Sequence, residues 1–497
     1  MLVEELVQLA QRIQRNQAEE QKIEVKAAHK GCPTRLYDTL SSFANQDCGG
    51  IIVFGLNENT GFETVGVYDL QDLQKKVTEQ CNQMEPHVRA VFTFADYEGR
   101  EICAAEIPAI DIAERPCFYR GSGRAKGSYV RVGDADLPMT DYEIYHYDSY
   151  RKHLHDDVRV IPRDIPNMMS DEKIEEYLND KKQERPQFAR MEKEQILEML
   201  NITRNGEFTL AALLNFCIYP QGIFPQFGIT AIVVPGYQIG DVGEDDTRFV
   251  DNKRIEGTIA EMVDDAVAFC KRNMKVKTII DDSGRRCDKT EYPVKAIREA
   301  VLNALIHRDY SVHTEGTPVQ IILYRDRMEI HSPGNLYGRM TVDLLGQARP
   351  DLRNPALAVM TESITGAENR YSGIPTIRRE LKGAGLPAPR FENRRNEFVV
   401  TFYNESAKYE YEQMEQGSDS FAVREPVYYY GSAKTEEERI LEFCQVPRLK
   451  AEIGSMLGLK TSFYVMSKYI APLLEKGKLA MTIPEKPQSK HQRYYTV

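Results

Sequence analysis

The stretch EAVLNALIHRDY, residues 299–310, decides the fold of the central part of this chain. Its apolar residues recur at helical spacing, and Glu299, Asn303 and His307 follow at intervals of four, so they share one helix face. A carboxylate and an amide placed in this way can orient water and hold Mg²⁺ beside phosphate oxygens. The same spacing is common on solvated helix faces, so the segment alone allows both interpretations.

The residues that follow this helix predict an α/β sandwich over residues 292–403. VQIILYRDRMEIHS, residues 319–332, has the pattern of a β-hairpin that turns at Arg325-Asp326, and EFVVTFY, residues 397–403, has the pattern of a closing strand. Helical segments lie between them.

Residues 299–310 resemble the N-box helix of the GHKL ATPases, in the divergent form of bacterial RecG-like and Schlafen-related ATP-binding regulators. The resemblance continues in order through YRDRMEIHSPGNL, RNPALA, SGIPTIRREL and PRFENRRNEFVVTF. It implies ATP and Mg²⁺ as ligands. By this resemblance Glu299 matches the base that orients the attacking water and Asn303 the magnesium-binding amide, with His307 beside the nucleotide. Gly334 and Gly373 match glycines that let the backbone approach the nucleotide and its phosphates.

Two departures from the GHKL pattern bear on function. Ser332 stands where the family usually carries an adenine-reading Asp, and the later glycine box keeps only Gly373, in YSGIPTI. Nucleotide binding is therefore better supported than hydrolysis, and ATPase activity stays open. The HRD triplet at residues 307–309 lacks the other protein-kinase motifs, so Arg308 and Asp309 are expected in ion pairs or phosphate contacts. A helicase motor is excluded because no GxxxxGK[ST] loop is present.

Residues 1–150 predict an α+β domain with a hairpin that turns at Glu98-Gly99. EQKIEVKAA, LSSFANQDCGGIIVFGLNENTG and RPCFYRGSGRAKGSYVRVGDADLPM resemble the Schlafen-type AlbA domain, which implies nucleic-acid binding. Glu19 and Glu24 keep the E-x4-E spacing that some Schlafen relatives use for metal-dependent RNA cleavage. The position near the third acid reads GLNENTG, so a surface charge pair between Glu24 and Lys26 is the favoured interpretation.

Basic residues interleave with aromatic residues near the end of this domain, a pattern suited to phosphate contact and base stacking. A solvated hairpin explains the pattern equally well. The predicted nucleic-acid contacts are Arg120, Arg124, Lys126 and Arg131, with Arg115 beside them.

The C-terminal end predicts a winged helix at residues 435–497, with three short helices followed by the strands KLAMTI and RYYTV. Winged helices bind DNA or other proteins, and an excess of basic residues favours DNA. The side chains expected to contact DNA are Thr461, Ser462 and Lys468 on the third helix and Lys490 and Arg493 beside the wing.

The whole chain predicts an α+β multidomain protein of 497 residues, with a net charge of −11. The expected parts are an AlbA-like domain at 1–150, a helical connector and middle mixed α/β domain at 151–290, a GHKL-like domain at 291–404, an acidic linker at 405–434 and the winged helix. Within the middle domain, a long helix is expected to start after Gly257. No apolar stretch is long enough for a membrane span, and scattered cysteines favour the cytoplasm.

Together these features favour a bacterial, ATP-binding transcriptional regulator that contacts DNA, or alternatively RNA, as a homo-oligomer. The alternative is a nucleotide-gated nuclease in a defence role.

Overall fold

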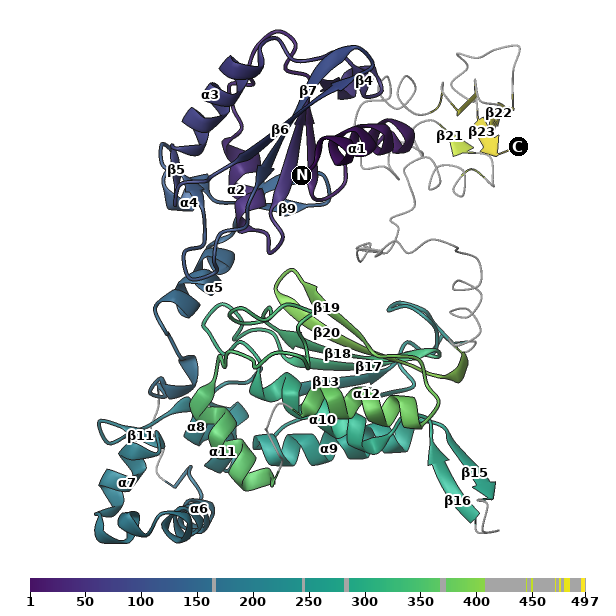
Figure 1. Cartoon of the computed structure of the whole chain (residues 1–497). Coiled ribbons are helices and arrows are strands. Elements are labelled where there is room, and N and C mark those ends of the chain that lie inside the picture. The colour runs from purple at the N-terminus through teal and green to yellow at the C-terminus, as the bar shows by residue number, and fades with distance from the viewer. Residues whose placement is uncertain are drawn as a thin grey trace. The chain divides into compact units, whose positions relative to one another are not determined.

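The computed structural model describes residues 1–162, 167–243, 246–280, 286–366 and 372–406, with residues 444, 448–449, 470, 473–474, 478–482 and 493–496 near the C-terminus. The chain divides into two compact units, Met1–Ser418 and Asp419–Val497 (Figure 1). Among the described residues, no helix has the length and apolarity needed to cross a membrane.

The first unit begins with a four-stranded sheet in the order β1-β2-β7-β6. Strands β1 and β2 are parallel, whereas the other neighbours are antiparallel. The predicted hairpin is confirmed, because β6 and β7 are joined at Glu98 and Gly99, both with positive φ. The strand bounds are β1 (Ile23–Lys26), β2 (Gly50–Phe54), β6 (Val91–Tyr97) and β7 (Arg100–Ile107).

Helices cover both faces of this sheet because its strands alternate buried side chains. Val53 and Ala104 pack in one core with α1 (Val3–Asn16). Ile52 and Ala105 pack in a second core with α2 (Tyr37–Asn45) and α3 (Leu70–Cys81). Shorter elements complete this part: β3 (Leu56–Asn57), η1 (Glu58–Thr60), β4 (Glu63–Thr64), β5 (Met84–Glu85), β8 (Phe118–Tyr119), α4 (Arg124–Gly127), β9 (Tyr129–Val132) and β10 (Ala135–Pro138).

Helix α5 (Asp141–Arg151) leads from this part into the rest of the unit. The Thr140 side chain accepts a hydrogen bond from the Glu143 amide, and the Glu143 carboxylate accepts one from the Thr140 amide, which caps the helix start. Beyond it lie η2 (Asp156–Val158), α6 (Asp171–Glu184), η3 (Pro186–Arg190), α7 (Lys193–Met199), β11 (Thr203–Arg204), β12 (Glu207–Phe208), α8 (Leu210–Phe216) and η4 (Pro220–Gly222).

A six-stranded mixed sheet in the order β14-β13-β17-β18-β20-β19 forms the centre of the unit. Strand β13 pairs in parallel with β17, and all other neighbours are antiparallel. The predicted hairpin at Arg325-Asp326 is confirmed, because it joins β17 to β18. The bounds are β13 (Ile229–Val233), β14 (Asp251–Ile255), β17 (Val319–Leu323), β18 (Arg327–Pro333), β19 (Arg390–Arg394) and β20 (Glu397–Tyr403).

This sheet corrects the domain boundary predicted between residues 290 and 291. Strands β13 and β14 precede that boundary, yet they share the sheet with β17 and β18. One hydrophobic core also runs from Ile161 to Phe402. The predicted boundary is wrong because pairing between strands about 90 residues apart leaves no local pattern in the sequence.

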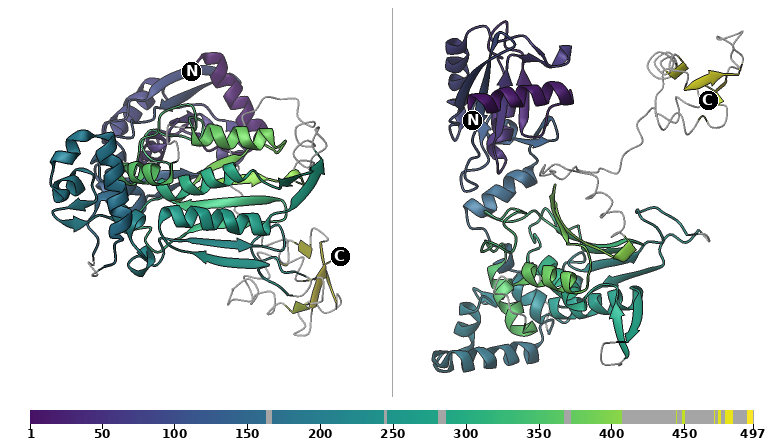
Figure 2. Two further views of the ribbon diagram at one scale, coloured as in Figure 1. Left: turned by 90° about the horizontal axis from the view of Figure 1, so that it is seen from below. Right: turned by 45° about the vertical axis from the view of Figure 1, so that its right-hand side comes forward.

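Three helices lie side by side against one face of the central sheet, with α10 in the middle (Figures 1 and 2). They are α9 (Ile259–Asn273), which starts after Gly257 as expected, α10 (Val294–Ile306) and α12 (Gly373–Gly383). Helix α11 (Pro355–Thr365) packs on α8, and β15 (Val276–Ile280) pairs with β16 (Arg286–Thr290). The predicted helix of residues 299–310 corresponds to α10, the central helix of this layer, but α10 ends at Ile306, so residues 307–310 lie beyond it.

The second unit contains a three-stranded sheet in the order β21-β23-β22. Strands β22 (Leu479–Met481) and β23 (Arg493–Thr496) are the two predicted wing strands, and they pair antiparallel. Strand β21 (Arg448–Leu449) completes the sheet. The predicted linker beyond residue 406 and the contact residues Thr461, Ser462, Lys468 and Lys490 lie outside the described residues, whereas Arg493 is exposed on β23.

Candidate functional site

A pocket of about 140 Å³ opens between α10, β18 and the first turn of α12. We call it the α10–α12 pocket. Its base is apolar because Ile330 on β18 and Phe398 and Val400 on β20 turn their side chains to the helix side of the sheet. An apolar base with a few polar groups at its rim suits a flat aromatic ligand.

Asn303 and Gly373 line one side of the pocket, and Glu299 contacts Asn303 just outside the lining. The Asn303 amide nitrogen donates to Oε1 of Glu299 over 3.3 Å, which leaves the Asn303 amide oxygen as the atom able to bind a cation. Burial raises the pKa of Glu299. A Cβ on Gly373 would stand 2.3 Å from that Glu299 oxygen and 2.7 Å from the Asn303 amide nitrogen, so a side chain here would displace the ends of both neighbouring side chains. The predicted roles of Glu299 and Asn303 thus have a matching geometry.

The start of α12 adds a site for negative charge. Gly373 and Ile374 line the pocket and lie in the first turn of α12, where amide N–H groups have no partner inside the helix. The helix dipole also places partial positive charge at this end. A phosphate group would find both features beside Asn303.

His307 and Arg353 are two further polar residues that line the pocket. Burial and the nearby Arg353 lower the pKa of His307 to about 4, so its ring is neutral at physiological pH. Arg353 lies 44 residues from its ion-pair partner Asp309 and was not predicted as a site residue. Its guanidinium is buried and donates to the backbone oxygen of Asn335 over 2.8 Å.

Ser332 and Gly334 line the pocket, but their contacts differ from the expected ones. The Ser332 hydroxyl donates to the backbone oxygen of Ala304 over 2.7 Å and so ties β18 to α10. Gly334 has a φ of +104°, and a Cβ there would stand 2.5 Å from Cβ of Asp309. This glycine therefore makes room for Asp309, in addition to any ligand.

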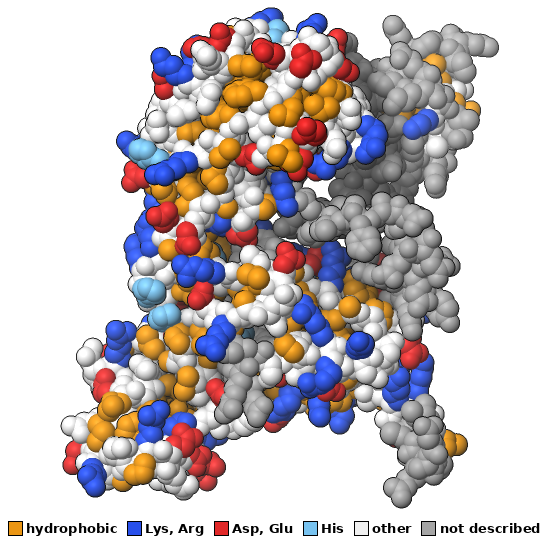
Figure 3. All heavy atoms as spheres, in the orientation of Figure 1, with side chains coloured by type: hydrophobic (Ala, Val, Ile, Leu, Met, Phe, Trp, Pro, Cys, Tyr) orange, Lys and Arg blue, Asp and Glu red, His pale blue; other side chains and the backbone are white. Residues whose placement is uncertain are grey.

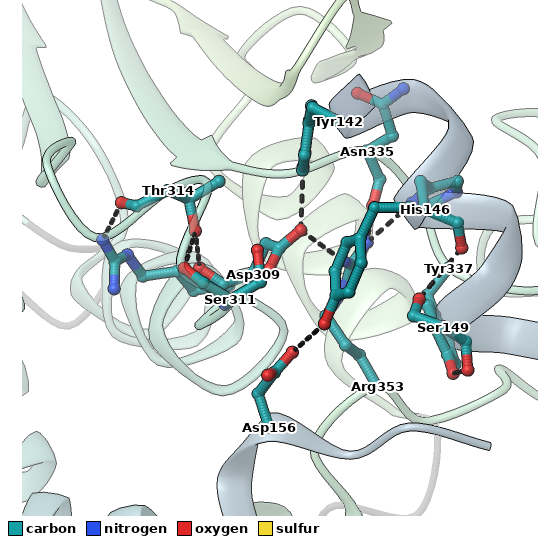
Figure 4. Close-up of polar contacts among 12 residues, drawn as sticks. Tyr142, His146, Ser149, Asp156, Asp309, Ser311, Thr314, Asn335, Tyr337 and Arg353 are labelled. Carbon is teal, nitrogen blue, oxygen red and sulfur yellow. Dashed lines mark hydrogen bonds and ion pairs between the residues drawn. The ribbon is translucent and has the colours of Figure 1, made fainter. Parts of the chain in front are cut away.

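Asp309 makes one of the expected ion pairs, with Arg353 (Figure 4), whereas Arg308 donates to backbone oxygens instead. Asp309 is fully buried and accepts from Arg353 over 2.6 Å and from the Tyr142 hydroxyl over 2.8 Å. Burial alone would raise the pKa of Asp309, but Arg353, Ser311 and Tyr142 outweigh it and lower this pKa. Arg308 donates to the backbone oxygens of Thr314 and Thr317.

The N-terminal acids Glu19 and Glu24 surround a buried arginine. Arg131 lies 3.5 Å from Glu19, 2.8 Å from Glu24 and 3.0 Å from Asp136, and its side chain is 1% exposed. Burial and the charge of Glu24 raise the pKa of Glu19 to about 7. The expected pair of Glu24 with Lys26 is present, but it is not a surface pair, because Arg131 from β9 covers Glu24. Asp136 is the third acid that the sequence did not reveal.

Burial also corrects part of the predicted nucleic-acid surface. Arg131 and Arg115 are buried in ion pairs, so neither can contact a phosphate. Arg124 donates to Asp148 of α5 over 2.6 Å. Arg120 and Lys126 are exposed, as predicted.

A stacked pair of Tyr37 and Tyr119, with ring centroids 3.8 Å apart, lies in the same region. On the face drawn in Figure 3, basic and acidic side chains are interspersed.

The mixed sheet, its helix layer and the α10–α12 pocket form one pocket-bearing domain, which α5 joins to the N-terminal domain. Comparison with known families agrees. Residues 316–402 match the family described as "Putative ATP-dependent DNA helicase recG C-terminal", and residues 19–140 match "Schlafen, AlbA_2". Residues 19–140 are therefore similar to a Schlafen AlbA_2 domain, and residues 316–402 are similar to a RecG C-terminal domain.

Residues 438–496 match "Filamentation induced by cAMP protein Fic-like, C-terminal domain". No curated protein matches the chain. Among solved structures, the DIP2311 protein from Corynebacterium diphtheriae is 16% identical, with a TM-score of 0.38, over 96% of this chain and 93% of that one. The N-terminal domain of a "Putative ATP-dependent DNA Helicase RecG-related Protein" from Nitrosomonas europaea is 22% identical, with a TM-score of 0.23, over 27% of this chain and 93% of that one.

Proposed function

We propose that this protein is an ATP-binding regulator, most specifically a transcriptional regulator, in which occupancy of the α10–α12 pocket modulates DNA binding. The observation that carries the proposal is the convergence of Asn303, Glu299 and the first turn of α12 at an apolar pocket. The base would lie on Ile330 and Val400, and the phosphates would lie toward the start of α12.

The residues of this pocket fit Mg²⁺ that arrives with the nucleotide. Magnesium bound to a nucleotide takes most of its ligands from phosphates and water and needs only one or two from the protein. Asn303 can supply its amide oxygen, and Glu299 holds that amide in place through its hydrogen bond. Because Glu299 is occupied in this way, we favour nucleotide sensing over rapid hydrolysis. Paired half-sites on DNA would require a homo-oligomer, which is part of the proposal.

Titration calorimetry with ATP and Mg²⁺ tests the pocket directly. In Gly373→Ala the new Cβ would displace the ends of the Glu299 and Asn303 side chains, so we expect ATP affinity to fall about tenfold or more, which is about 1.4 kcal/mol. Gly383→Ala is the matched control, because it lies at the end of the same helix with nothing within 4 Å of the added Cβ. Absence of ATP binding by the wild-type protein would refute the proposal, as would equal affinities of the two variants.

The nuclease alternative is not supported by the geometry at Glu19 and Glu24. The Arg131 guanidinium pairs with these carboxylates and with Asp136, at the place where a divalent cation would have to stand. In the part of the chain that the structure describes, no cluster of three or more His, Cys, Asp or Glu residues is arranged to hold a metal. These residues therefore do not fit a resident divalent metal, and we propose no cleavage step for them.

A further inference from the structure

Helix α5 contacts the surroundings of the α10–α12 pocket through Tyr142, His146 and Ser149, and the Ser149 backbone oxygen accepts from the hydroxyl of Tyr337, which lines the pocket. Tyr142 and His146 lie one turn apart on α5, so they share a face. The Tyr142 hydroxyl donates to Asp309 over 2.8 Å, and Nδ1 of His146 lies 3.4 Å from Nη2 of Arg353 (Figure 4). Burial lowers the pKa of His146 to about 3, so its ring is neutral and Nδ1 can accept from the guanidinium.

Arg353 belongs to the pocket and to this contact at the same time. It lines the pocket, it donates to Asp309 over 2.6 Å, and it donates to Asn335, which is also a pocket residue. The buried Nε atom of Arg353 has no hydrogen-bond partner among the described residues. The guanidinium therefore has hydrogen-bonding capacity left over beside the pocket.

The other contacts of α5 connect it to the N-terminal domain and to the central sheet. Asp148 accepts from Arg124, which precedes the exposed Lys126 on α4. Glu143 accepts two hydrogen bonds from Arg395, each 2.9 Å long, at the turn between β19 and β20. Helix α5, which is eleven residues long, thus joins the predicted nucleic-acid surface to both the sheet and the pocket.

We propose that α5 transmits occupancy of the pocket to the AlbA-type domain, with the Asp309–Arg353 pair as the contact that a nucleotide alters. A triphosphate beside Arg353 competes with Asp309 for the guanidinium, because both are anions and Arg353 is their shared cation. Weakening that ion pair changes the hydrogen bond that Asp309 accepts from Tyr142 and the contact between Arg353 and His146. Coupling then follows from the difference in these contacts between the two states.

This inference rests on the proposed nucleotide site, and Tyr142→Phe tests it separately. The variant removes only the hydroxyl that meets Asp309, and it leaves every residue that lines the pocket. The matched control is Tyr145→Phe, which removes a buried hydroxyl on the same helix that donates to Asp156 instead. Anisotropy of labelled duplex DNA, with and without Mg-ATP, gives the coupling factor, and calorimetry gives ATP affinity.

In the wild-type protein we expect Mg-ATP to change DNA affinity by about fivefold or more. Tyr142→Phe should bring that factor close to one while ATP affinity stays within about twofold, which would be about 0.4 kcal/mol. Tyr145→Phe should keep the wild-type factor. A wild-type factor in Tyr142→Phe, equal loss in both variants, or ATP binding without any coupling would each overturn the inference and leave the nucleotide site standing. Absence of ATP binding would overturn both proposals.

Hydrogen exchange of the wild-type protein gives a measurement that needs no variant. We expect Mg-ATP to change the exchange of the amides of α5 as well as those at the start of α12. Unchanged exchange in α5, together with protection at α12, would contradict the role of α5 even if Tyr142→Phe fails to fold.

Discussion

Arg353→Met should destabilise the central domain far more than the loss of one surface charge. The change removes the cation and keeps most of the side-chain volume, but it leaves the carboxylate of Asp309 fully buried without its ion-pair partner. Breaking a buried ion pair in this way costs about 3–5 kcal/mol. Tyr142 and the Ser311 amide still donate to Asp309, which favours the lower part of that range.

The loss of the bond from Arg353 to the Asn335 backbone adds about 1 kcal/mol, for a total near 4 kcal/mol. For a domain of this size, that corresponds to a fall in Tm of roughly 8–16 °C. Far-UV circular dichroism during urea and thermal unfolding is the suitable assay, because the chain contains no Trp.

A double-mutant cycle separates the ion pair from general packing loss. Asp309→Asn also removes one charge, and it leaves Arg353 as the uncompensated partner. The double variant should therefore cost about 3 kcal/mol less than the sum of the single variants. A cost below about 1 kcal/mol for Arg353→Met, or additivity within about 0.5 kcal/mol, would refute this reasoning.

The pH dependence of Arg353→Met provides a second check on the same contact. Without Arg353, burial raises the pKa of Asp309 above its unfolded value, and the folded state then favours the protonated acid. The destabilisation should consequently be smaller at pH 5 than at pH 8. A destabilisation that does not depend on pH would mean that Asp309 is not the group left uncompensated.

Three further predictions concern other ionisable groups. Burial by itself would lower the pKa of His331, but the hydrogen bonds and charges of Glu329 and Glu397 outweigh burial and raise this pKa to about 9. The stabilisation by charged His331 is therefore full below about pH 6.5 and is lost as pH rises toward 9. Urea unfolding of His331→Asn should show a loss of roughly 2–3 kcal/mol at pH 6 that disappears at pH 9.5; an equal loss at both pH values would contradict this. Because the pKa of Glu19 is raised to about 7, ionisation of Glu19 opposes folding, and the stability lost grows from about pH 4.3 to 7 and stays lost above pH 7. Glu19→Gln should then unfold at higher urea than the wild type at pH 8, and a lower midpoint would count against the assignment. Incubation of the wild-type protein with labelled RNA and Mn²⁺ or Mg²⁺ should give no cleavage, whereas cleavage that Glu24→Ala abolishes would restore the nuclease alternative.

Local sequence patterns predicted the parts of the fold that depend on neighbouring residues. The hairpins at Glu98-Gly99 and Arg325-Asp326 and the start of α9 after Gly257 were all confirmed, because turn residues and helix periodicity act over a few positions. The contact between Glu299 and Asn303 was predictable for the same reason, since residues four apart on a helix are neighbours.

Long-range contacts were not predictable in this way. Arg131 belongs to a basic and aromatic segment, and nothing in its neighbours shows that Glu19, Glu24 and Asp136 close around it. Asp309 and Arg353 are 44 residues apart, and Tyr142 is 167 residues from Asp309. The tyrosine-rich pattern of DYEIYHYDSY, residues 141–150, was the available signal, because large aromatic side chains on a polar helix indicate a buried face.

The pairing of β13 with β17 has a consequence for how the chain folds during synthesis. Strand β13 cannot pair with β17 until Val319, the partner of Ile229, has been synthesised. The sheet is complete only when β20 has been synthesised. At about 5–20 residues per second, the segment between these strands alone takes several seconds. The AlbA-type domain, whose sheet ends at Ile107, can be complete on the ribosome well before any pocket exists. Helix α5 is therefore synthesised before the pocket-bearing domain, with Tyr142 still exposed, and that domain then assembles against α5.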